Sequence, residues 1–294
     1  MNTRVLEEEF DYIKPATLAE ALDILAGDKI VRIFAGGTDL IVKMKMADMP
    51  IDIMMDINGI PELFKVEETD DGGVSIGAAE KLSVLEKNEK LVRDYPGLTE
   101  AIHAMASVSV RNMATLGGNF MNASPVADAV AACLAYDASV VLEKKDGKRV
   151  VKAEDFFTGP GKTVLEPHEM LTAVLLPPVK ANTGAVYCKL ARVKSDIAKL
   201  SVGVVLDRDG DKIGSARITM SAVAATPLYV RGISEGLAGK TVSMEMIEQT
   251  AKDIAAFIKP IDDNRTTAEY RKDVTAVIAR DAIAEAWKRS GGTL

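Results

Sequence analysis

Apolar residues recur with a helical period near the start of the chain. Residues 15–28 place four apolar side chains on one helical face. Thr17 and Glu20 have the spacing of a capping box at its start, and Gly27 suits the left-handed position at its end. The pattern therefore predicts a surface helix with defined ends.

Strand-like runs follow this helix. Short apolar stretches at 29–34 and 50–59 predict buried strands, with a turn closing the second one. Residues 72–87 predict a strand, a turn and a helix. The alternation of strand and helix is typical of an α/β or α+β unit.

Paired strands dominate the middle of the chain. Residues 139–153 predict a hairpin around Asp146-Gly147, the favoured pair of a type I′ turn. Pro177 and Pro178 close the next strand and mark the expected domain boundary.

The last third predicts a smaller α+β unit. Residues 185–224 have the pattern of an antiparallel meander with a turn at Asp209-Gly210. Two helices should follow, with Ser243 and Thr266 as their N-caps.

Composition narrows the functional classes. Hydrophobic residues make up 48% and charged residues 27% of the 294 positions, as in ordinary globular proteins. The net charge of −7 argues against a nucleic-acid partner. Two cysteines and two histidines, none clustered, argue against a metal or iron–sulfur site on this chain. The N-terminus lacks a leader-like pattern and no apolar stretch is long enough to span a membrane, so a cytoplasmic location is expected.

Two glycine pairs stand at junctions where a ligand could approach the backbone. In the first, a strand runs into Ala35-Gly36-Gly37-Thr38-Asp39 and then into a helical turn. Glycine allows a tight turn, and the N–H groups at a helix start favour an anion. The G-x-G-x-x-G and P-loop patterns are absent, so plain turn chemistry remains an alternative.

The second pair, Gly117-Gly118, suggests another backbone-exposed turn. It is followed by Ser124-Pro125, a favourable helix opening, and by Asp128 in the first turns of that helix. Asp128 could accept from sugar or ribityl hydroxyls, or could only complement the helix dipole. Two such turns with small polar neighbours suit a long ligand with a diphosphate and a ring.

Several motifs in order resemble one family. AGGTDL, TLGGNFMNASPVADAVAACLAYDA, FFTGPGKTVLEPHEML, YCKLARVKSDIAKLSVGV and SAVAATPL together resemble the FAD-binding subunit of the molybdenum hydroxylases, with the bacterial xanthine dehydrogenase flavoprotein as the closest type. The resemblance covers nearly the whole chain. It implies an α+β fold: a two-part FAD-binding domain of the p-cresol methylhydroxylase type, then a small C-terminal sheet-plus-helices domain. The expected domains are 1–178, divided into 1–58 and 59–178, and 183–290.

The resemblance also implies site residues for non-covalent FAD. The first glycine segment would cradle the pyrophosphate, the second would line the flavin side, Asp128 would hold a hydroxyl, and Leu171 and Lys189 would lie near the flavin ring. The expected FAD-binding residues are Arg32, Ile33, Phe34, Ala35, Gly36, Gly37, Thr38, Asp39, Thr115, Leu116, Gly117, Gly118, Asn119, Asn122, Asp128, Leu171 and Lys189.

The implied function is electron relay. A molybdenum-binding large subunit would oxidise a heteroaromatic substrate such as a purine, and [2Fe–2S] centres on a small subunit would pass electrons to this FAD and on to NAD or another acceptor. The molybdenum cofactor and the clusters would lie only on these partners. Alternatives are a subunit of a nicotinate- or carbon monoxide-dehydrogenase-like complex, a stand-alone flavin reductase of the same fold, and a scaffold whose glycine turns bind nothing.

Overall fold

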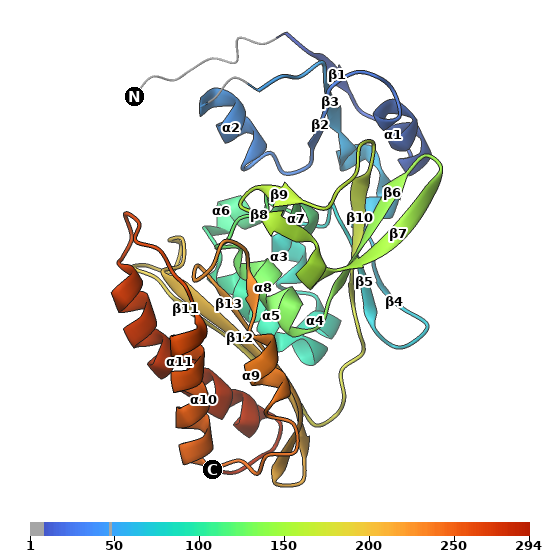
Figure 1. Cartoon of the computed structure of the whole chain (residues 1–294). Coiled ribbons are helices and arrows are strands. Elements are labelled where there is room, and N and C mark those ends of the chain that lie inside the picture. The colour runs from blue at the N-terminus through green and yellow to red at the C-terminus, as the bar shows by residue number, and fades with distance from the viewer. Residues whose placement is uncertain (1–8, 47–48) are drawn as a thin grey trace.

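The computed structural model describes residues 9–46 and 49–294 (Figure 1). The prediction that the N-terminus lacks a leader falls on residues 1–8, which lie outside the described residues. Within the described ranges, no helix is both long and apolar enough to cross a membrane.

The N-terminal unit is a small parallel sheet flanked by two helices. Its strands pair in the order β1-β3-β2, and Phe34 at the end of β2 lies opposite Asp56 at the end of β3. Both strand ends therefore open at the same edge of the sheet. The elements are β1 (Asp11–Ile13), α1 (Leu18–Leu25), β2 (Val31–Phe34), α2 (Leu40–Met46) and β3 (Ile53–Asp56).

The middle unit joins an antiparallel sheet to a group of short helices. The sheet order is β4-β5-β10-β6-β7, and the apolar faces of its strands share one core with helices α3, α4, α5, α7 and α8. Its elements are η1 (Ile57–Gly59), η2 (Pro61–Phe64), β4 (Val66–Glu68), β5 (Val74–Gly77), α3 (Leu82–Leu85), α4 (Glu89–Asp94), α5 (Pro96–Ala104), α6 (Val108–Arg111), α7 (Leu116–Asn122), α8 (Asp128–Ala135), β6 (Ser139–Lys144), β7 (Gly147–Lys152), η3 (Ala153–Asp155), β8 (Phe157–Gly159), β9 (Lys162–Thr163) and β10 (Met170–Leu176).

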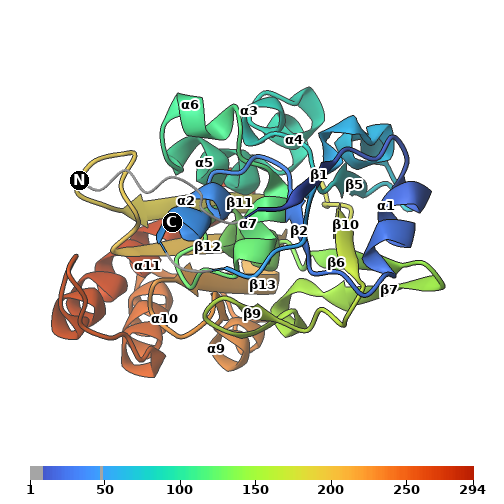
Figure 2. The same cartoon turned by 90° about the horizontal axis from the view of Figure 1, so that it is seen from above.

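The C-terminal unit is a four-stranded antiparallel meander covered on both faces. Helices α10 and α11 cover one face, and α5 and α8 of the middle unit pack on the other (Figures 1 and 2). This arrangement confirms the predicted order of an FAD-binding-type α+β unit followed by a sheet-plus-helices domain. The elements are β11 (Thr183–Leu190), β12 (Leu200–Asp209), β13 (Lys212–Ser221), β14 (Leu228–Tyr229), α9 (Arg231–Glu235), α10 (Met244–Phe257) and α11 (Ala268–Arg289).

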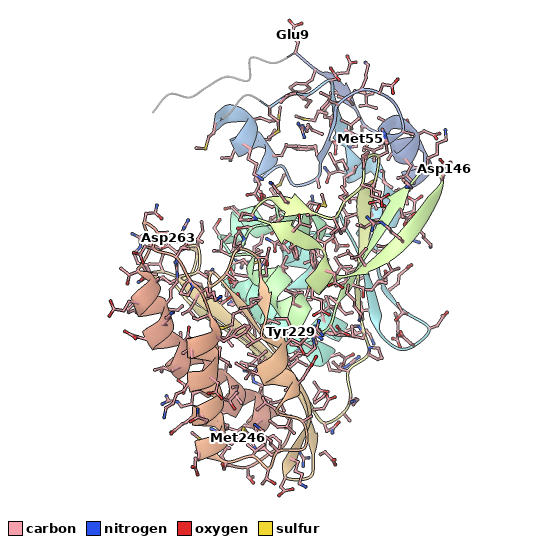
Figure 3. The ribbon with its side chains drawn as sticks, viewed as in Figure 1. Glu9, Met55, Asp146, Tyr229, Met246 and Asp263 are labelled. Carbon is pink, nitrogen blue, oxygen red and sulfur yellow. The ribbon has the colours of Figure 1, made fainter. Side chains whose placement is uncertain are left out.

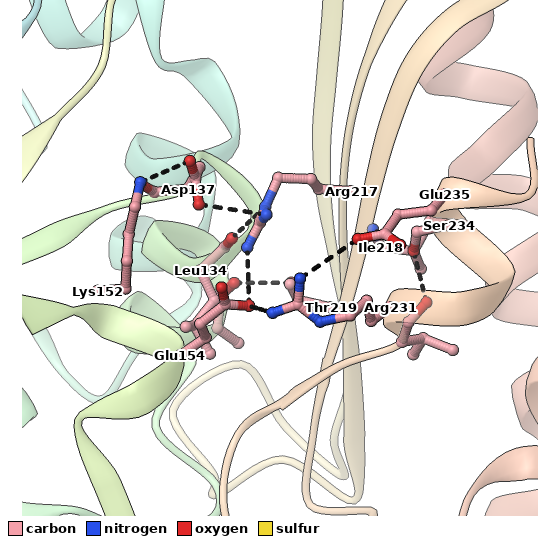
Figure 4. A network of polar contacts seen from close by, with 12 residues as sticks. Leu134, Asp137, Lys152, Glu154, Arg217, Ile218, Thr219, Arg231, Ser234 and Glu235 are labelled. Carbon is pink, nitrogen blue, oxygen red and sulfur yellow. Dashed lines mark hydrogen bonds and ion pairs between the residues drawn. The ribbon is translucent and has the colours of Figure 1, made fainter. Parts of the chain in front are cut away.

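An arginine-centred network ties the middle and C-terminal units together (Figure 4). Arg217 on β13 donates to the carbonyl of Leu134 at 3.1 Å and pairs with Asp137 at 3.2 Å. Its guanidinium lies 3.9 Å from the ring centroid of Tyr229, a residue that Figure 3 places on the C-terminal unit. Arg231 pairs with Glu154 of the middle unit at 2.7 Å. These contacts explain how the two units keep a fixed relation.

Both predicted hairpin turns are shifted by one residue. Lys144 pairs with Gly147, so Lys145 and Asp146 form the first turn, at the tip labelled in Figure 3. Neither residue has a positive φ, so the turn is not type I′. In the second hairpin Asp209 itself is the paired residue, and Gly210 follows it with φ of +63°.

Helix ends show the other errors of prediction. Thr17 caps α1 as predicted, accepting from Glu20 N at 3.2 Å, but Gly27 does not adopt a positive φ. Ser243 caps α10, whereas Thr267 and not Thr266 caps α11. Two adjacent threonines offer the same capping chemistry, so sequence alone does not choose between them.

Candidate functional site

The first glycine segment leaves a row of backbone donors unused. It connects β2 to α2, and the N–H groups of Gly36, Gly37, Thr38 and Asp39 donate to no protein acceptor within the described part of the chain. Gly37 has φ of +69°, a conformation that side chains other than hydrogen make costly. Gly36, Gly37 and Thr38 are half-buried and Asp39 is exposed, and N–H groups at the start of a helix are open to an anion, so this row is a candidate anion cradle.

The second glycine pair differs from its prediction. Gly117 and Gly118 lie in the first turn of helix α7 and do not form a separate turn, although Gly118 is exposed. Thr115 caps this helix and accepts from Gly118 N at 2.9 Å. A Cβ on Gly117 would lie 2.5 Å from the carbonyl oxygen of Ala78, so this glycine is required by close packing. Ser124 likewise does not cap α8, which begins at Asp128 after a separate turn.

The two glycine segments meet in space. A Cβ on Gly36 would overlap the carbonyl of Met113, just before the second segment. Asn122 at the end of α7 donates to Asp39 Oδ1 at 3.2 Å, and Lys43 donates to Asn122 Oδ1 at 2.6 Å. Segments about eighty residues apart in the sequence thus form one polar site.

Asn119 supplies an independent sign of a ligand-binding site. Its Oδ1 is buried and is the one buried side-chain polar atom without a hydrogen-bond partner among residues 9–46 and 49–294. An unpartnered buried acceptor costs about 1–3 kcal/mol, which a donor on a bound molecule would recover. The cradle of N–H groups and this acceptor together fit FAD, whose pyrophosphate accepts hydrogen bonds and whose other parts donate them.

Asn58 and Lys81 connect the first segment to the neighbouring strand ends. The Asn58 amide donates to Ala35 O at 2.9 Å and to Asp56 Oδ1 at 2.6 Å, and its Oδ1 accepts from Lys81 Nζ at 3.0 Å. Burial would raise the pKa of Asp56, but hydrogen bonds from Tyr12 and Asn58 outweigh it and hold that pKa below its usual value. Asp56 is thus an ionised anchor at the strand edge.

Asp128 and Lys189 form a buried pair. Lys189 Nζ lies 3.0 Å from Asp128 Oδ2 and donates to the carbonyl of Ala104 at 2.9 Å, while the Tyr187 hydroxyl donates to Asp128 Oδ1 at 2.5 Å. Burial raises the pKa of Asp128, with Lys189 and Tyr187 opposing the rise. The pair fastens the start of α8 to β11, so both residues have a structural role that the sequence did not show.

The remaining predicted site residues lie around the cradle or in the core. Arg32 Nε donates to Pro50 O at 3.0 Å and Ile33 packs in the N-terminal core. Phe34 contacts the position that a Gly37 side chain would take, and Leu116 is fully buried. Leu171, 4% exposed, belongs to the middle core.

Four residues of this region were missed from the sequence. Lys43, Asn58 and Tyr187 bond directly to residues that were predicted, and Lys81 bonds to Asn58. Lys43 carried a weak signal, since it stands one helical turn after Asp39. Asn58 was assigned only to a turn, and Lys81 and Tyr187 depend on contacts across the fold that no local pattern encodes.

Comparison with known proteins agrees with this geometry. Residues 8–179 match the FAD-binding domain in molybdopterin dehydrogenase, and residues 185–286 match the C-terminal domain of the carbon monoxide dehydrogenase flavoprotein. The glyceraldehyde dehydrogenase medium chain of Sulfolobus acidocaldarius is 31% identical, over 94% of this chain and 98% of the relative. The xanthine dehydrogenase FAD-binding subunit of Escherichia coli O157:H7 is 28% identical, over 96% and 98%.

A solved structure extends the likeness to the backbone. Carbon monoxide dehydrogenase from Hydrogenophaga pseudoflava, in a form that lacks the Mo-pyranopterin moiety, superposes with a TM-score of 0.91 and 32% identity, covering 96% of this chain and 98% of that one. The family prediction is therefore confirmed. This chain belongs to the family of FAD-binding subunits of molybdopterin dehydrogenases, the molybdenum hydroxylases.

Proposed function

We propose that the chain is the electron-transfer subunit that carries FAD in a molybdenum hydroxylase complex. A small partner with [2Fe–2S] centres would deliver electrons, and a large partner with the molybdenum cofactor would oxidise the substrate. The observation that supports this most is the row of unused N–H groups at Gly36–Asp39 beside the unpartnered Asn119 Oδ1.

FAD binding would divide between the two glycine segments. Gly36, Gly37, Thr38 and Asp39 would hold the pyrophosphate through backbone N–H groups, with Arg32, Ile33, Phe34 and Ala35 shaping the approach. Thr115, Leu116, Gly117, Gly118 and Asn119 would line the flavin side, and Asn122 would fix the two segments together through Asp39 and Lys43.

We also propose FAD contacts at Asp128, Lys189 and Leu171, for which fewer observations argue. A carboxylate oxygen can accept two hydrogen bonds, and each oxygen of Asp128 accepts one from a side chain, Tyr187 or Lys189. Asp128 therefore has room for a ligand hydroxyl. Lys189 would act as a positive charge near the ring, and Leu171 as an apolar wall. The proposed domain limits stay at 1–178, divided after residue 58, and 183–290.

FAD, when bound, accepts electrons singly and releases two together as hydride, which suits a position between iron–sulfur centres and NAD. The chain's own part is to bind and orient this group. The unused N–H groups lose no reorganisation energy when they meet an anion, because the loop already holds them in place.

The substrate belongs to the partner and is proposed as a heteroaromatic ring of the purine type. The sequence favoured a xanthine dehydrogenase-like complex, yet relatives named for glyceraldehyde and carbon monoxide are at least as similar. A carbon monoxide- or nicotinate-dehydrogenase-like complex is the alternative.

The acceptor is proposed to be NAD or another electron acceptor. A cavity of ≈ 400 Å³ lies beyond the end of β11 and is lined by three cationic side chains, those of Arg192, Lys199 and Arg265, with Asp196 as the acidic member. Arg192 pairs with Asp196 at 3.0 Å and Arg265 pairs with Asp263 at 3.1 Å, so two of the three lining charges are already neutralised and the cavity favours no particular acceptor.

Anaerobic flavin bleaching of the purified chain tests the proposal. The chain should take up FAD; NADH should bleach it, and hypoxanthine should do so only after the two partner subunits are added. Failure to take up FAD would refute the proposal. Rapid bleaching of the isolated chain by the purine would indicate a stand-alone flavoenzyme instead, and failure with NADH alone would remove only the nicotinamide part.

A further inference from the structure

We propose that the Lys81 ammonium group supplies the positive charge that neutralises the pyrophosphate of FAD. The inference rests on the proposed function and adds to it a residue outside both glycine segments. A cradle made only of backbone N–H groups carries partial charges, whereas a pyrophosphate carries full ones.

Lys81 stands between the two glycine segments. Its backbone forms an isolated antiparallel bridge with Thr115, the cap of α7. Its Nζ donates to Asn58 Oδ1 at 3.0 Å, and the same Asn58 amide donates to Ala35 O at 2.9 Å. One short chain of contacts therefore connects this lysine to the beginning of each segment.

The charge of Lys81 has no direct counter-ion. The side chain is half-buried, and no carboxylate lies within 4.0 Å of its Nζ among residues 9–46 and 49–294; its other close contact is the Phe64 ring, 5.9 Å away. An ammonium group has three donors, and one of them is engaged by Asn58. Burial lowers the pKa of Lys81, and Asp56 and Glu80 raise it only in part. A bound anion would relieve this unfavourable state.

The two neighbouring carboxylates are engaged elsewhere. Asp56 accepts from the Tyr12 hydroxyl at 2.5 Å and from Asn58, whose backbone N–H and side-chain amide lie 2.9 and 2.6 Å from Oδ1. Glu80 is buried and accepts from the backbone N–H of Lys81 at 3.0 Å, and burial raises its pKa. Neither carboxylate accepts a hydrogen bond from the Lys81 ammonium group, so that group stays available to a ligand.

Lys81 could instead be only a prop for Asn58, and the variants are chosen to separate the two roles. Lys81→Gln keeps an N–H donor for Asn58 but removes the charge. Lys81→Arg keeps the charge. Lys65→Met removes a lysine charge from an exposed position, where its side chain is 55% accessible and pairs with Glu67.

The experiment measures dissociation constants for FAD, ADP and riboflavin on the full apo-chain, together with its thermal midpoint. Lys81→Gln should weaken FAD and ADP, which carry the pyrophosphate, by about tenfold or more and leave riboflavin within about twofold. Lys81→Arg should stay near the wild type for all three, as should Lys65→Met.

The outcomes separate this inference from the proposed function. A wild-type chain that does not bind FAD would end the proposed function. Normal FAD binding by both the wild type and Lys81→Gln would overturn the role of Lys81 alone. Equal losses of affinity for FAD and riboflavin, together with a lower thermal midpoint, would show that Lys81 only supports Asn58. That result would also overturn the proposed role of Lys81. If Lys81→Gln does not fold, the Lys81→Arg variant decides. A folded Lys81→Arg that loses affinity for FAD and for riboflavin equally would contradict the charge role.

Discussion

The glycine segment at Gly36–Asp39 and the Asp128–Lys189 pair were predicted to serve the same cofactor, yet their polar groups are in opposite states. The segment has four N–H groups without acceptors in the described part of the chain, whereas both carboxylate oxygens of Asp128 accept from side chains of the chain itself. A site that holds its polar groups open is ready for a ligand. A site whose polar groups already bond to one another mainly stabilises the fold. Substitutions there should lower the stability of the protein more than its affinity for the cofactor.

The largest effect expected from this comparison is loss of stability in Lys189→Met. Removing the lysine leaves the Asp128 carboxylate buried and without its cation, a change that costs about 3–5 kcal/mol. Urea unfolding of the apo-chain measures it. The double variant Asp128→Asn with Lys189→Met should recover part of the loss, because the uncompensated charge is gone.

The same variant has a defined pH dependence. Burial already raises the pKa of Asp128, and removal of Lys189 should raise it further. A carboxyl whose pKa is raised by folding favours the folded state at pH below its unfolded value of about 3.9 and loses this contribution as pH rises through the folded value. The deficit relative to the wild type should therefore be smaller at acid pH than at neutral pH. An equal deficit at both would show that the charge is not its cause.

An intermediate effect is expected for Gly36→Ala. The added Cβ would overlap the Met113 carbonyl, and backbone must move to admit it, at about 1–3 kcal/mol. Gly232→Ala on α9 is the matched control, since a Cβ there meets nothing within 4 Å. Thermal unfolding of the apo-proteins compares them. Equal midpoints for Gly36→Ala and the control would mean that this glycine serves only ligand approach.

Gly37→Val would not isolate the role of this glycine in ligand approach. Gly37 has φ of +69°, and a Cβ there would overlap the Phe34 ring, so the substitution strains the apo-chain as well.

The smallest effect is expected for Asn119→Ala. Its Oδ1 has no partner among residues 9–46 and 49–294, so removing it should leave apo-stability unchanged or slightly higher. Loss of one neutral hydrogen bond should weaken FAD binding by about 1 kcal/mol. Flavin fluorescence titration and a thermal melt give the two values. A loss of stability with unchanged FAD affinity would show that Asn119, like the Asp128–Lys189 pair, serves the fold and not the cofactor.

Local signals account for what could be predicted from the sequence. The capping of α1 by Thr17, the hairpin of β6 and β7, and the meander from β11 follow from periodicity and turn residues within short windows. The family resemblance supplied the two-domain order and FAD. These signals lie in short stretches of sequence and can be recognised without the tertiary structure.

Contacts between distant segments could not be predicted in this way. The helical setting of Gly117 depends on the Ala78 carbonyl across the fold, and the Asp128–Lys189 pair forms only because α8 packs on the C-terminal sheet. The Lys81–Asn58–Ala35 connection joins three segments, and no local pattern at Lys81 or Asn58 indicates their contact with the first glycine segment. Such residues become visible only when the fold brings them together.

The packing of α5 and α8 against the C-terminal sheet has a consequence for how the chain can be divided. The Arg217 network and this shared apolar face join the two units independently of the peptide link near residues 177–183. A protease cut in that link would leave a nicked protein whose halves remain associated. The C-terminal half produced alone would instead expose an apolar sheet face to water and tend to aggregate.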